Sequence, residues 1–224
     1  MNKQMPDKST IILDEILRHV PFEGWTSRAV NMAMAALDLP RGMEHIYAPG
    51  GALGLLQLWS SRLDQQLTAE IEQSRFEDMR IRDKVTQAVW LRLNLLAGHE
   101  EAARRGMSRL ALPDGASQAA SQLWASSDAI WTALGDQSED YNYYTKRGIL
   151  SGVIGSTLLV WLGDNTDDKS DARQFLDSRI KNVMQFEKLK GKTLGTLRGL
   201  PNPEEFLNLF KKDMPHRRRR RYRR

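Results

Sequence analysis

Cysteine is absent from this chain of 224 residues. Its absence excludes disulfide bridges, cysteine zinc sites, iron–sulfur clusters and cysteine nucleophiles, and it fits a reducing compartment. Long apolar runs are missing as well. The longest uncharged run has 16 residues, from Gly148 to Gly163, whereas a membrane-spanning helix needs about 20 apolar residues. We therefore expect this run to form a buried helix of a soluble fold.

The motifs of the common enzyme classes are missing too. The four histidines lie far apart in the sequence without an H-E-x-x-H pattern, and there is no G-x-S-x-G, phosphate-binding loop or dinucleotide-binding glycine motif. An acidic cluster at 164–171 fails the calcium-loop spacing and fits a helix-capping turn better. We predict that the chain is not an enzyme and holds no metal or cofactor.

Strand signals are scarce, and apolar residues recur at helical spacing through most of the chain. We predict an all-α fold of about ten helices, at 9–20, 27–37, 40–47, 52–74, 81–96, 100–110, 116–134, 140–162, 169–190 and 204–212. Pro21 is expected to end the first of these. The predicted organisation is a helix-turn-helix-like head (1–50), a helical ligand-binding and dimerisation body (51–190), a Gly/Pro linker (191–203) and an amphipathic helix with a basic tail (204–224).

Positive charge is concentrated at the end of the chain. The last 14 residues hold nine Lys or Arg and one Asp, whereas residues 1–210 hold 24 Lys or Arg and 27 Asp or Glu. The head resembles the start of TetR-type regulators, with a short third helix that ends at Tyr47. A DNA-binding head needs cations to neutralise phosphates. The third helix offers Arg41, Glu44 and His45, and Glu44 has the wrong sign to face phosphates. We expect a helix-turn-helix retained for packing, with no specific DNA binding.

The body is rich in tryptophan at helical spacing, with Leu and Met on the same faces. Such a stripe is typical either of a plain core or of the wall of a cavity for an apolar ligand. The residues concerned are Trp59, Trp90, Trp124 and Trp131.

Two features mark the helix expected at 140–162. It begins with the segment DYNYYTKR (140–147), which places three tyrosines and two cations within eight residues. Because Tyr and Arg are favoured at binding hot spots, the segment indicates either a partner surface or an ordinary amphipathic helix start. A stripe of small residues follows at Gly148, Gly152 and Gly155. It allows another helix to approach closely, within the chain or across a homodimer.

The C-terminal helix has an apolar face and a basic flank. This pattern is typical of an interfacial helix on anionic lipid. The alternatives are a helix docked on the body and an arginine tail that binds RNA. The residues concerned are Phe206, Leu207, Leu209, Phe210, Lys211 and Lys212.

Three segments resemble a family of ubiquinone biosynthesis accessory proteins, the ninth coenzyme Q factor. They are ILD…HVPFEGW (12–25), DYNYYTKR (140–147) and FLDSRI (175–180), and the similarity covers about residues 9–190. The resemblance implies a TetR-like, all-helical dimer that is not a repressor. It also implies that an isoprenoid lipid is bound in the body, that a quinone intermediate is presented to a di-iron hydroxylase, and that the C-terminal helix meets the membrane. Tyr143 stands where the family usually has Trp.

On this basis we predict a non-catalytic lipid-binding accessory protein of ubiquinone biosynthesis. A TetR-type transcription regulator that senses an apolar ligand is the alternative. The first ten residues show no leader pattern, so we expect a cytoplasmic protein, peripheral on the inner membrane of a bacterium. The expected lipid-cavity residues are Trp90, Trp124, Trp131 and Ile154. The expected partner patch consists of Tyr143, Tyr144, Lys146 and Arg147. The expected membrane contacts are Phe206, Leu207, Leu209, Phe210, Lys211 and Lys212.

Overall fold

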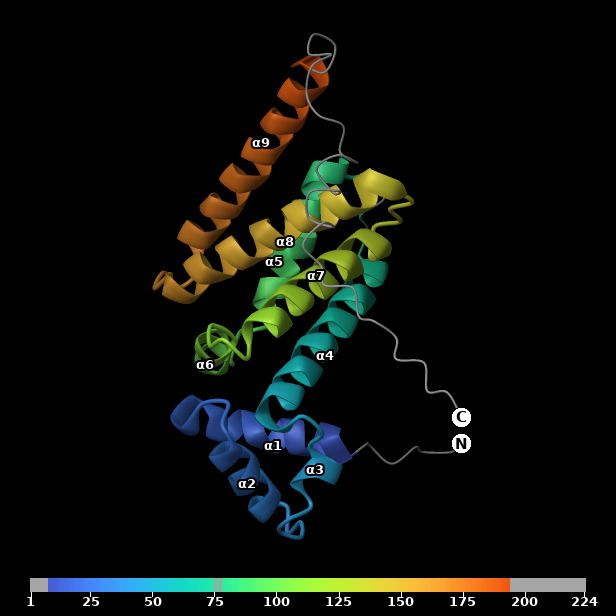
Figure 1. Ribbon diagram of the computed structural model, residues 1–224. Helices are drawn as coiled ribbons and strands as arrows, with labels where there is room; N and C mark the ends of the chain where they lie inside the picture. The colour runs from blue at the N-terminus through green and yellow to red at the C-terminus, as the bar shows by residue number, and fades with distance from the viewer. Residues whose placement is uncertain (1–7, 75, 77, 194–224) are drawn as a thin grey trace, which may run out of the picture. The chain divides into compact units, whose positions relative to one another are not determined.

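A computed structural model describes residues 8–74, 76 and 78–193. The chain divides into two units, residues 1–181 and 182–224, and the contacts given below lie within the first. Nine α-helices and no strand occur among the described residues (Figure 1), so the predicted all-α class is confirmed. The helices are α1 (Lys8–Glu23), α2 (Ser27–Ala36), α3 (Glu44–Tyr47), α4 (Gly51–Gln73), α5 (Ile81–Asn94), α6 (Glu100–Leu110), α7 (Ala116–Ala133), α8 (Asp140–Gly163) and α9 (Ser170–Thr193).

The tenth expected helix, at 204–212, lies outside the described residues. So do all six predicted membrane contacts, from Phe206 to Lys212. Their role stays a prediction.

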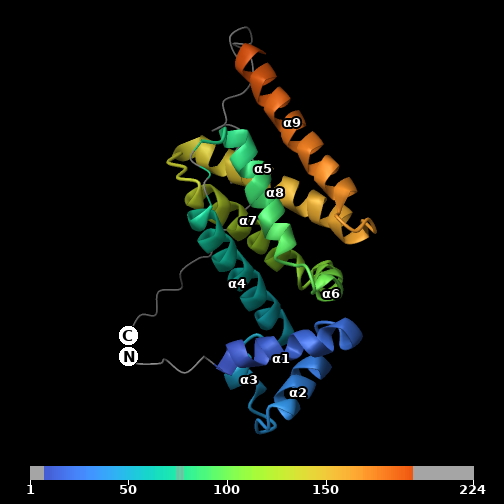
Figure 2. The same ribbon diagram turned by 180° about the vertical axis from the view of Figure 1, so that it is seen from behind.

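Helices α1, α2 and α3 form the head, residues 8–50, which both ribbon views show as a separate group beside the start of α4 (Figures 1 and 2). The apolar face of α1 packs mainly on α2. The expected end of α1 at Pro21 is wrong, because the helix continues to Glu23. A proline in the last turn removes only one helical hydrogen bond. The turn closes when the N–H of Gly24 donates to the carbonyl of Val20 at 2.8 Å, and Gly24, with φ +67°, then ends the helix.

The body is built around α7, which packs against α4 and against α8. Helix α4 carries its buried residues at spacings of three and four, so one face of the helix points into the core. Those residues are Leu55, Leu56, Trp59, Ser60, Leu63, Asp64, Leu67 and Ile71. The run predicted to be a buried helix is the main part of α8, whose residues Leu150, Val153, Ile154 and Trp161 are buried.

One aromatic contact joins the head to the body. The indole N–H of Trp25 donates to the carbonyl of Ala102 in α6 at 3.0 Å, and the Trp25 ring stacks on Trp59 of α4 at 5.6 Å between centroids. Gly106 makes room for this contact. A Cβ on Gly106 would lie 3.1 Å from Leu56 Cδ1 and 3.4 Å from Trp25 Nε1. The head therefore rests closely on α6.

The glycine stripe of α8 divides into two parts. A Cβ at Gly155 would lie 3.3 Å from Leu123 Cδ1 of α7, so this glycine permits packing within the chain. A Cβ at Gly148 or Gly152 would meet nothing within 4 Å. These two glycines are therefore not needed for packing inside the described part of the chain, and a homodimer contact through them stays a prediction.

Candidate functional site: an apolar pocket and a neighbouring surface

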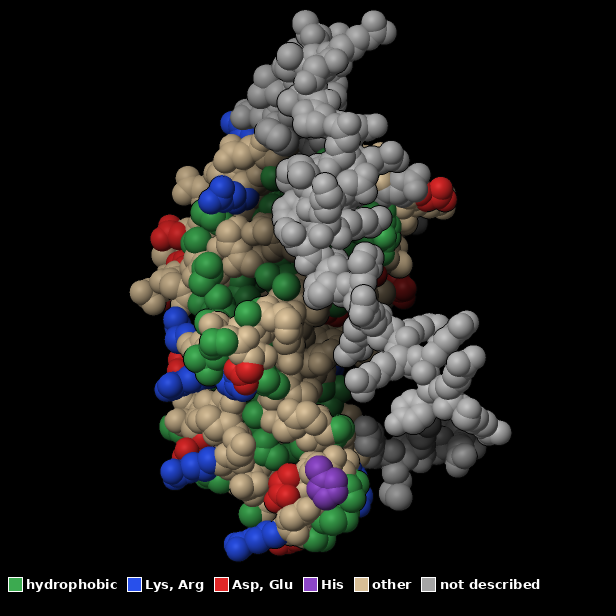
Figure 3. All heavy atoms as spheres, in the orientation of Figure 1, with side chains coloured by type: hydrophobic (Ala, Val, Ile, Leu, Met, Phe, Trp, Pro, Cys, Tyr) green, Lys and Arg blue, Asp and Glu red, His purple; other side chains and the backbone are tan. Residues whose placement is uncertain are grey.

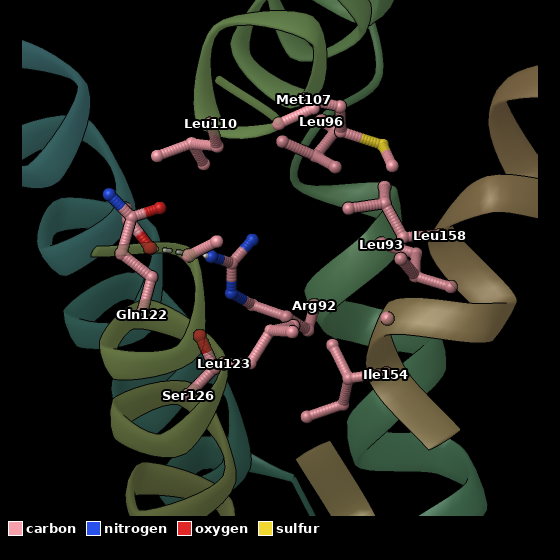
Figure 4. A pocket seen from close by; sticks show the side chains of 14 residues that line it. Arg92, Leu93, Leu96, Met107, Leu110, Gln122, Leu123, Ser126, Ile154 and Leu158 are labelled. Atoms are coloured by element: carbon pink, nitrogen blue, oxygen red, sulfur yellow. Dashed lines mark hydrogen bonds between the residues drawn. The ribbon is translucent and has the colours of Figure 1, made fainter. Parts of the chain in front are cut away.

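An apolar pocket of about 260 Å³ lies among α4, α5, α6, α7 and α8 (Figure 4). Aliphatic side chains from four helices and from the turn after α5 form most of its wall, and small residues on α7 and α8 leave the space open. The lining residues are Ser60, Arg92, Leu93, Leu96, Met107, Leu110, Ala111, Ala119, Gln122, Leu123, Ser126, Ile154, Gly155 and Leu158.

Helical spacing explains why these residues meet. Ile154 and Leu158 are four residues apart on α8, and Ala119, Leu123 and Ser126 follow at spacings of four and three on α7. Each of these two helices thus presents one row of side chains to the same pocket.

Five polar side chains lie together at one side of the pocket, and we call this cluster the polar floor. They are Arg92, Asp64, Ser60, Ser126 and Gln122. Arg92 Nε donates to Asp64 Oδ1 at 2.6 Å, and the two side chains are only 9% and 11% exposed. The hydroxyl of Ser126 donates to the same carboxylate, 2.8 Å from Oδ1 and 3.0 Å from Oδ2. Ser60 Oγ lies 3.4 Å from Arg92 Nη2. In Figure 4 the Arg92 guanidinium points toward the centre of the pocket.

Only one of the four predicted cavity residues lines this pocket, namely Ile154. Trp90 lies against Arg173, whose guanidinium carbon is 5.1 Å from the Trp90 ring centre. Trp124 contacts Tyr144 at 6.1 Å between centroids, and Trp131 Nε1 donates to the Lys146 carbonyl at 3.3 Å. The three tryptophans therefore lie away from the pocket, and this pocket gives no support to their predicted lipid contact.

The sequence-based prediction assigned the cavity mainly to tryptophan side chains and so did not identify the aliphatic residues that line the pocket. Leu123 faces the pocket, and Trp124 is the next residue, about 100° further round the helix. One signal pointed to the pocket: Arg92 shares a helix face with Val85, Ala88 and Val89. An arginine among buried apolar residues needs a buried partner, and Asp64 provides it.

The four residues of the predicted partner patch lie together at the start of α8, but they differ in exposure. Tyr144 is 64% exposed, whereas the Arg147 side chain is 3% exposed. Arg147 Nε donates to Asp128 Oδ1 at 2.5 Å, and Lys146 Nζ donates to Asp136 Oδ1 at 2.7 Å. Arg147 and Lys146 are thus held by carboxylates of α7 and the α7–α8 turn. Tyr144 is more exposed than the Lys146 side chain, which is 40% exposed.

Ion pairing around Asp136 keeps this region charged. Burial raises the pKa of Asp136, but hydrogen bonds from Lys146 and Ser138 outweigh burial and leave the pKa below its ordinary value. Burial lowers the pKa of Arg147, and the hydrogen bond to Asp128 reverses this and raises it. Asp136 and Arg147 are therefore both ionised at neutral pH.

The acidic cluster predicted to form a capping turn does so through Asp164. Its Oδ1 accepts a hydrogen bond from the backbone N–H of Thr166, and its Oδ2 accepts one from that of Ala172 in α9, each at 2.9 Å. Across the residues that the structure covers, no group of three or more His, Cys, Asp or Glu side chains is placed to hold a metal ion.

The head carries little positive charge where a DNA-binding surface would need it. Residues 8–50 contain four Lys or Arg and five Asp or Glu. Backbone N–H groups of Glu44 and Gly42 lower the pKa of the Glu44 carboxyl on α3, so it is anionic. Figure 3 shows acidic and basic side chains intermixed over the head on one face of the molecule.

The helices of the described residues include none that is both long enough and apolar enough to cross a membrane.

The fold and the internal pocket define a TetR-like, all-helical protein. The solved structure of a TetR transcriptional regulator from Nitrosomonas europaea superposes with a TM-score of 0.62 at 18% identity, covering 79% of this chain and 98% of the regulator. At that identity the similarity concerns the fold alone.

The family follows from sequence comparison. Residues 116–187 match the COQ9 family model. The ubiquinone biosynthesis protein COQ9, mitochondrial, of Rattus norvegicus is 31% identical over 179 residues, and its human counterpart is 30% identical. The aligned region covers 77% of this chain and 57% and 56% of those two proteins. The resemblance found in the sequence is thus confirmed, and this chain belongs to the COQ9 family. It spans a little over half the length of these relatives.

Proposed function

We propose that this chain is a non-catalytic accessory protein of ubiquinone biosynthesis, which binds an isoprenoid quinone or a related lipid in the apolar pocket. The observation that carries the proposal is the pocket itself, lined mainly by aliphatic side chains, in a chain of the COQ9 family. Each methylene group moved from water into such a site contributes about 0.8 kcal/mol. The relatives' names place them in the same pathway.

The size of the pocket limits what it holds. Its volume of about 260 Å³ falls just below the range of about 300–1,000 Å³ that is common for small-molecule sites. We infer that it takes one end of a long lipid while the remainder of the lipid lies outside.

The charged groups of the pocket support a binding role. Arg92 and Asp64 are hydrogen-bonded to each other at 2.6 Å, and Ser126 also donates to Asp64. Both charges are thus committed to one internal contact, which suits a fixed wall better than a proton-transfer site.

The partner, membrane and dimer contacts belong to the same proposal. We place Tyr144 at the surface that meets a di-iron quinone hydroxylase, with Arg147 holding that surface in position. The basic amphipathic segment 204–224 would attach the chain to an anionic membrane as a peripheral protein. The open glycines of α8, Gly148 and Gly152, would allow a second copy to pack closely. A bacterial inner membrane remains the predicted location.

The proposal is tested by native mass spectrometry of the full chain, with extraction and identification of the lipid that co-purifies. We expect about one isoprenoid quinone or related lipid per subunit. Ala119→Phe fills the pocket and should remove the lipid, whereas Ala125→Phe, an exposed position on the same helix, should leave it bound. A wild-type chain that binds no isoprenoid lipid, even when one is supplied, would overturn the proposal.

A regulator function has a different signature. It requires the head to bind duplex DNA with an affinity that falls steeply as salt rises. The four Lys or Arg against five Asp or Glu of residues 8–50 do not favour it. A shift of an operator-like duplex by the lipid-free chain at physiological salt would establish it.

A further inference from the structure

A groove between α5 and α9 is lined largely by polar and charged side chains and shares no lining residue with the apolar pocket. It consists of two adjoining hollows, of about 370 and 420 Å³, which have Arg173 and Asp177 in common. The lining residues include Thr86 and Trp90, four residues apart on α5, and Arg173 and Asp177, four residues apart on α9. Each helix therefore presents one face to the groove, which we call the α5–α9 groove.

Arg173 is held in this groove by two uncharged side chains of α5. Its guanidinium carbon lies 5.1 Å from the centre of the Trp90 ring, and its Nη2 donates to Gln87 Oε1 at 3.3 Å. Among the described residues Arg173 forms no ion pair with a carboxylate. A guanidinium positioned in this way keeps its charge and most of its five N–H donors for a further acceptor.

The other charges of the first hollow favour an anion beside Arg173. Arg82 is already paired with Asp83, with 3.1 Å between Nε and Oδ1. Lys181 lines the same hollow and forms no ion pair within the described part of the chain. Two unpaired cations, Arg173 and Lys181, therefore face one unpaired carboxylate, that of Asp177.

The second hollow has the opposite balance of charge. Besides Arg173 it is lined by Asp177 and Asp168, and Asp168 accepts a hydrogen bond from the backbone N–H of Ser170 at 3.2 Å. An anion is therefore favoured only toward Lys181. There Asp177 opposes it, because a nearby carboxylate repels a second negative charge.

We propose that the α5–α9 groove binds a phosphate group, with Arg173 as the main ligand, Lys181 as a second positive charge and Asp177 as the residue that weakens binding. Phosphate oxygens match the planar donor fork of an arginine and also bind a lysine ammonium. Met79 and Ile180 line the same hollow, so it also accommodates an organic substituent of the phosphate. The ligand class is thus an organic phosphate, either a small phosphate ester or a phospholipid headgroup.

The test is a titration of the full chain with inorganic phosphate, followed by NMR through the indole N–H of Trp90, whose signal is assigned from Trp90→Phe. Because Arg173 stacks on this ring, an anion held by Arg173 should shift the signal. Phosphate bound at the arginines of 217–224 should not. Chloride and acetate at equal ionic strength serve as control anions.

The same titration separates the two sources of the phosphate. It compares glycerol phosphate with dihexanoyl phosphatidate, a short-chain lipid that carries the same headgroup phosphate. Equal affinities assign the site to small phosphate esters. Binding of the phosphatidate that is about tenfold tighter assigns it to a lipid headgroup whose chains lie in the groove.

Two substitutions one turn apart on α9 should have opposite effects. Arg173→Gln removes the main ligand and should weaken phosphate binding about tenfold or more. Asp177→Asn removes the opposing carboxylate and should strengthen binding about two- to fivefold. Arg179→Gln is the matched control, because the Arg179 guanidinium also lies on an aromatic ring, 4.9 Å from the centre of Phe175, but does not line the groove. It should keep the wild-type affinity.

A purely structural role for Arg173 gives a different pattern. If Arg173 and Asp177 served each other, Asp177→Asn would not strengthen phosphate binding. Unchanged or weaker binding by Asp177→Asn would overturn the proposal, as would a Trp90 signal that no phosphate shifts, or acetate binding as tight as that of phosphate. Asp177→Asn leaves Arg173 and Trp90 in place, so it decides the matter even if Arg173→Gln does not fold. None of these outcomes depends on lipid binding in the apolar pocket.

Discussion

The guanidinium carbon of Arg147 lies 3.5 Å from the centre of the Tyr143 ring. The same guanidinium donates to Asp128 at 2.5 Å and contacts Asp136 at 3.4 Å. Arg147 therefore links α7, the α7–α8 turn and the aromatic start of α8. From this position we predict that Arg147 supports the proposed partner patch structurally and does not contact a partner itself, and the next two predictions test the two roles.

Replacement of Arg147 by alanine should destabilise the fold strongly. It leaves the buried Asp136 without one of its cations and removes the stacking on Tyr143, and breaking a buried ion pair costs about 3–5 kcal/mol. Because the Asp128 side chain is 41% exposed, we expect the lower end, about 3 kcal/mol, in urea unfolding. Arg147→Lys keeps the charge but loses the two-pronged guanidinium contact, so its free energy of unfolding should lie between those of the wild type and Arg147→Ala. A change below 1 kcal/mol in Arg147→Ala would contradict the supporting role.

Replacement of Tyr144 by alanine should lower stability only slightly and weaken partner binding strongly. The side chain is largely exposed and its internal contacts are with the rings of Trp124 and Tyr143. We expect a stability cost of about 1 kcal/mol. Binding to the proposed hydroxylase partner, measured by pull-down with the purified enzyme, should weaken about tenfold or more, as at an interface hot spot. Leu159→Ala, at an exposed position further along α8, serves as the control. Equal binding by the wild type and Tyr144→Ala would show that Tyr144 does not contact the hydroxylase.

Stability should fall in acid because of Asp136. Its folded pKa lies below its ordinary value, so its contribution is present above the unfolded pKa of about 3.9 and is lost as pH falls through the folded pKa. In denaturant titrations between pH 7 and pH 2, the stability gap between the wild type and Asp136→Asn should shrink as pH falls. A gap that stays constant over this range would show that Asp136 gains nothing from Lys146 and Ser138 when it is ionised.

Membrane attachment should depend on the apolar face of the segment 204–212. Phe206→Asp with Phe210→Asp places two anions on a face that would otherwise enter the lipid interface. We expect the double variant to lose flotation with vesicles that contain anionic lipid, while thermal unfolding of the body is unchanged. Phe22, which is exposed on the head, offers a control in Phe22→Asp. Undiminished flotation of the double variant would exclude the predicted role.

Most of the helical layout could be predicted from the sequence because it depends on short-range patterns. Apolar residues at spacings of three and four located nine helices, to within a few residues of their ends. Pro21 was misjudged because proline is compatible with the last turn of a helix, where the sequence alone does not show which turn is last.

The pocket was harder to predict, because its lining depends on how the helices are rotated against one another. Ile154 lines the pocket, as does Leu123 rather than Trp124, and their contact with a lipid stays a prediction. The buried state of Gln122 Nε2 depends on neighbours that are distant in sequence, so no local pattern shows it. The exposure of Tyr144 beside the buried Arg147 likewise appears only when α7 and α8 are packed together.

Helix α6 contacts the head and also forms part of the pocket wall. Met107 and Leu110 form part of the pocket wall, and Gly106, one residue earlier, lies under Trp25 of the head. Both contacts fall within two turns of the same 11-residue helix. The head therefore packs from outside against a helix that forms part of the pocket wall. Damage to the head, far from the pocket in sequence, should therefore change the shape of the pocket, and the head has this structural role whether or not it binds DNA.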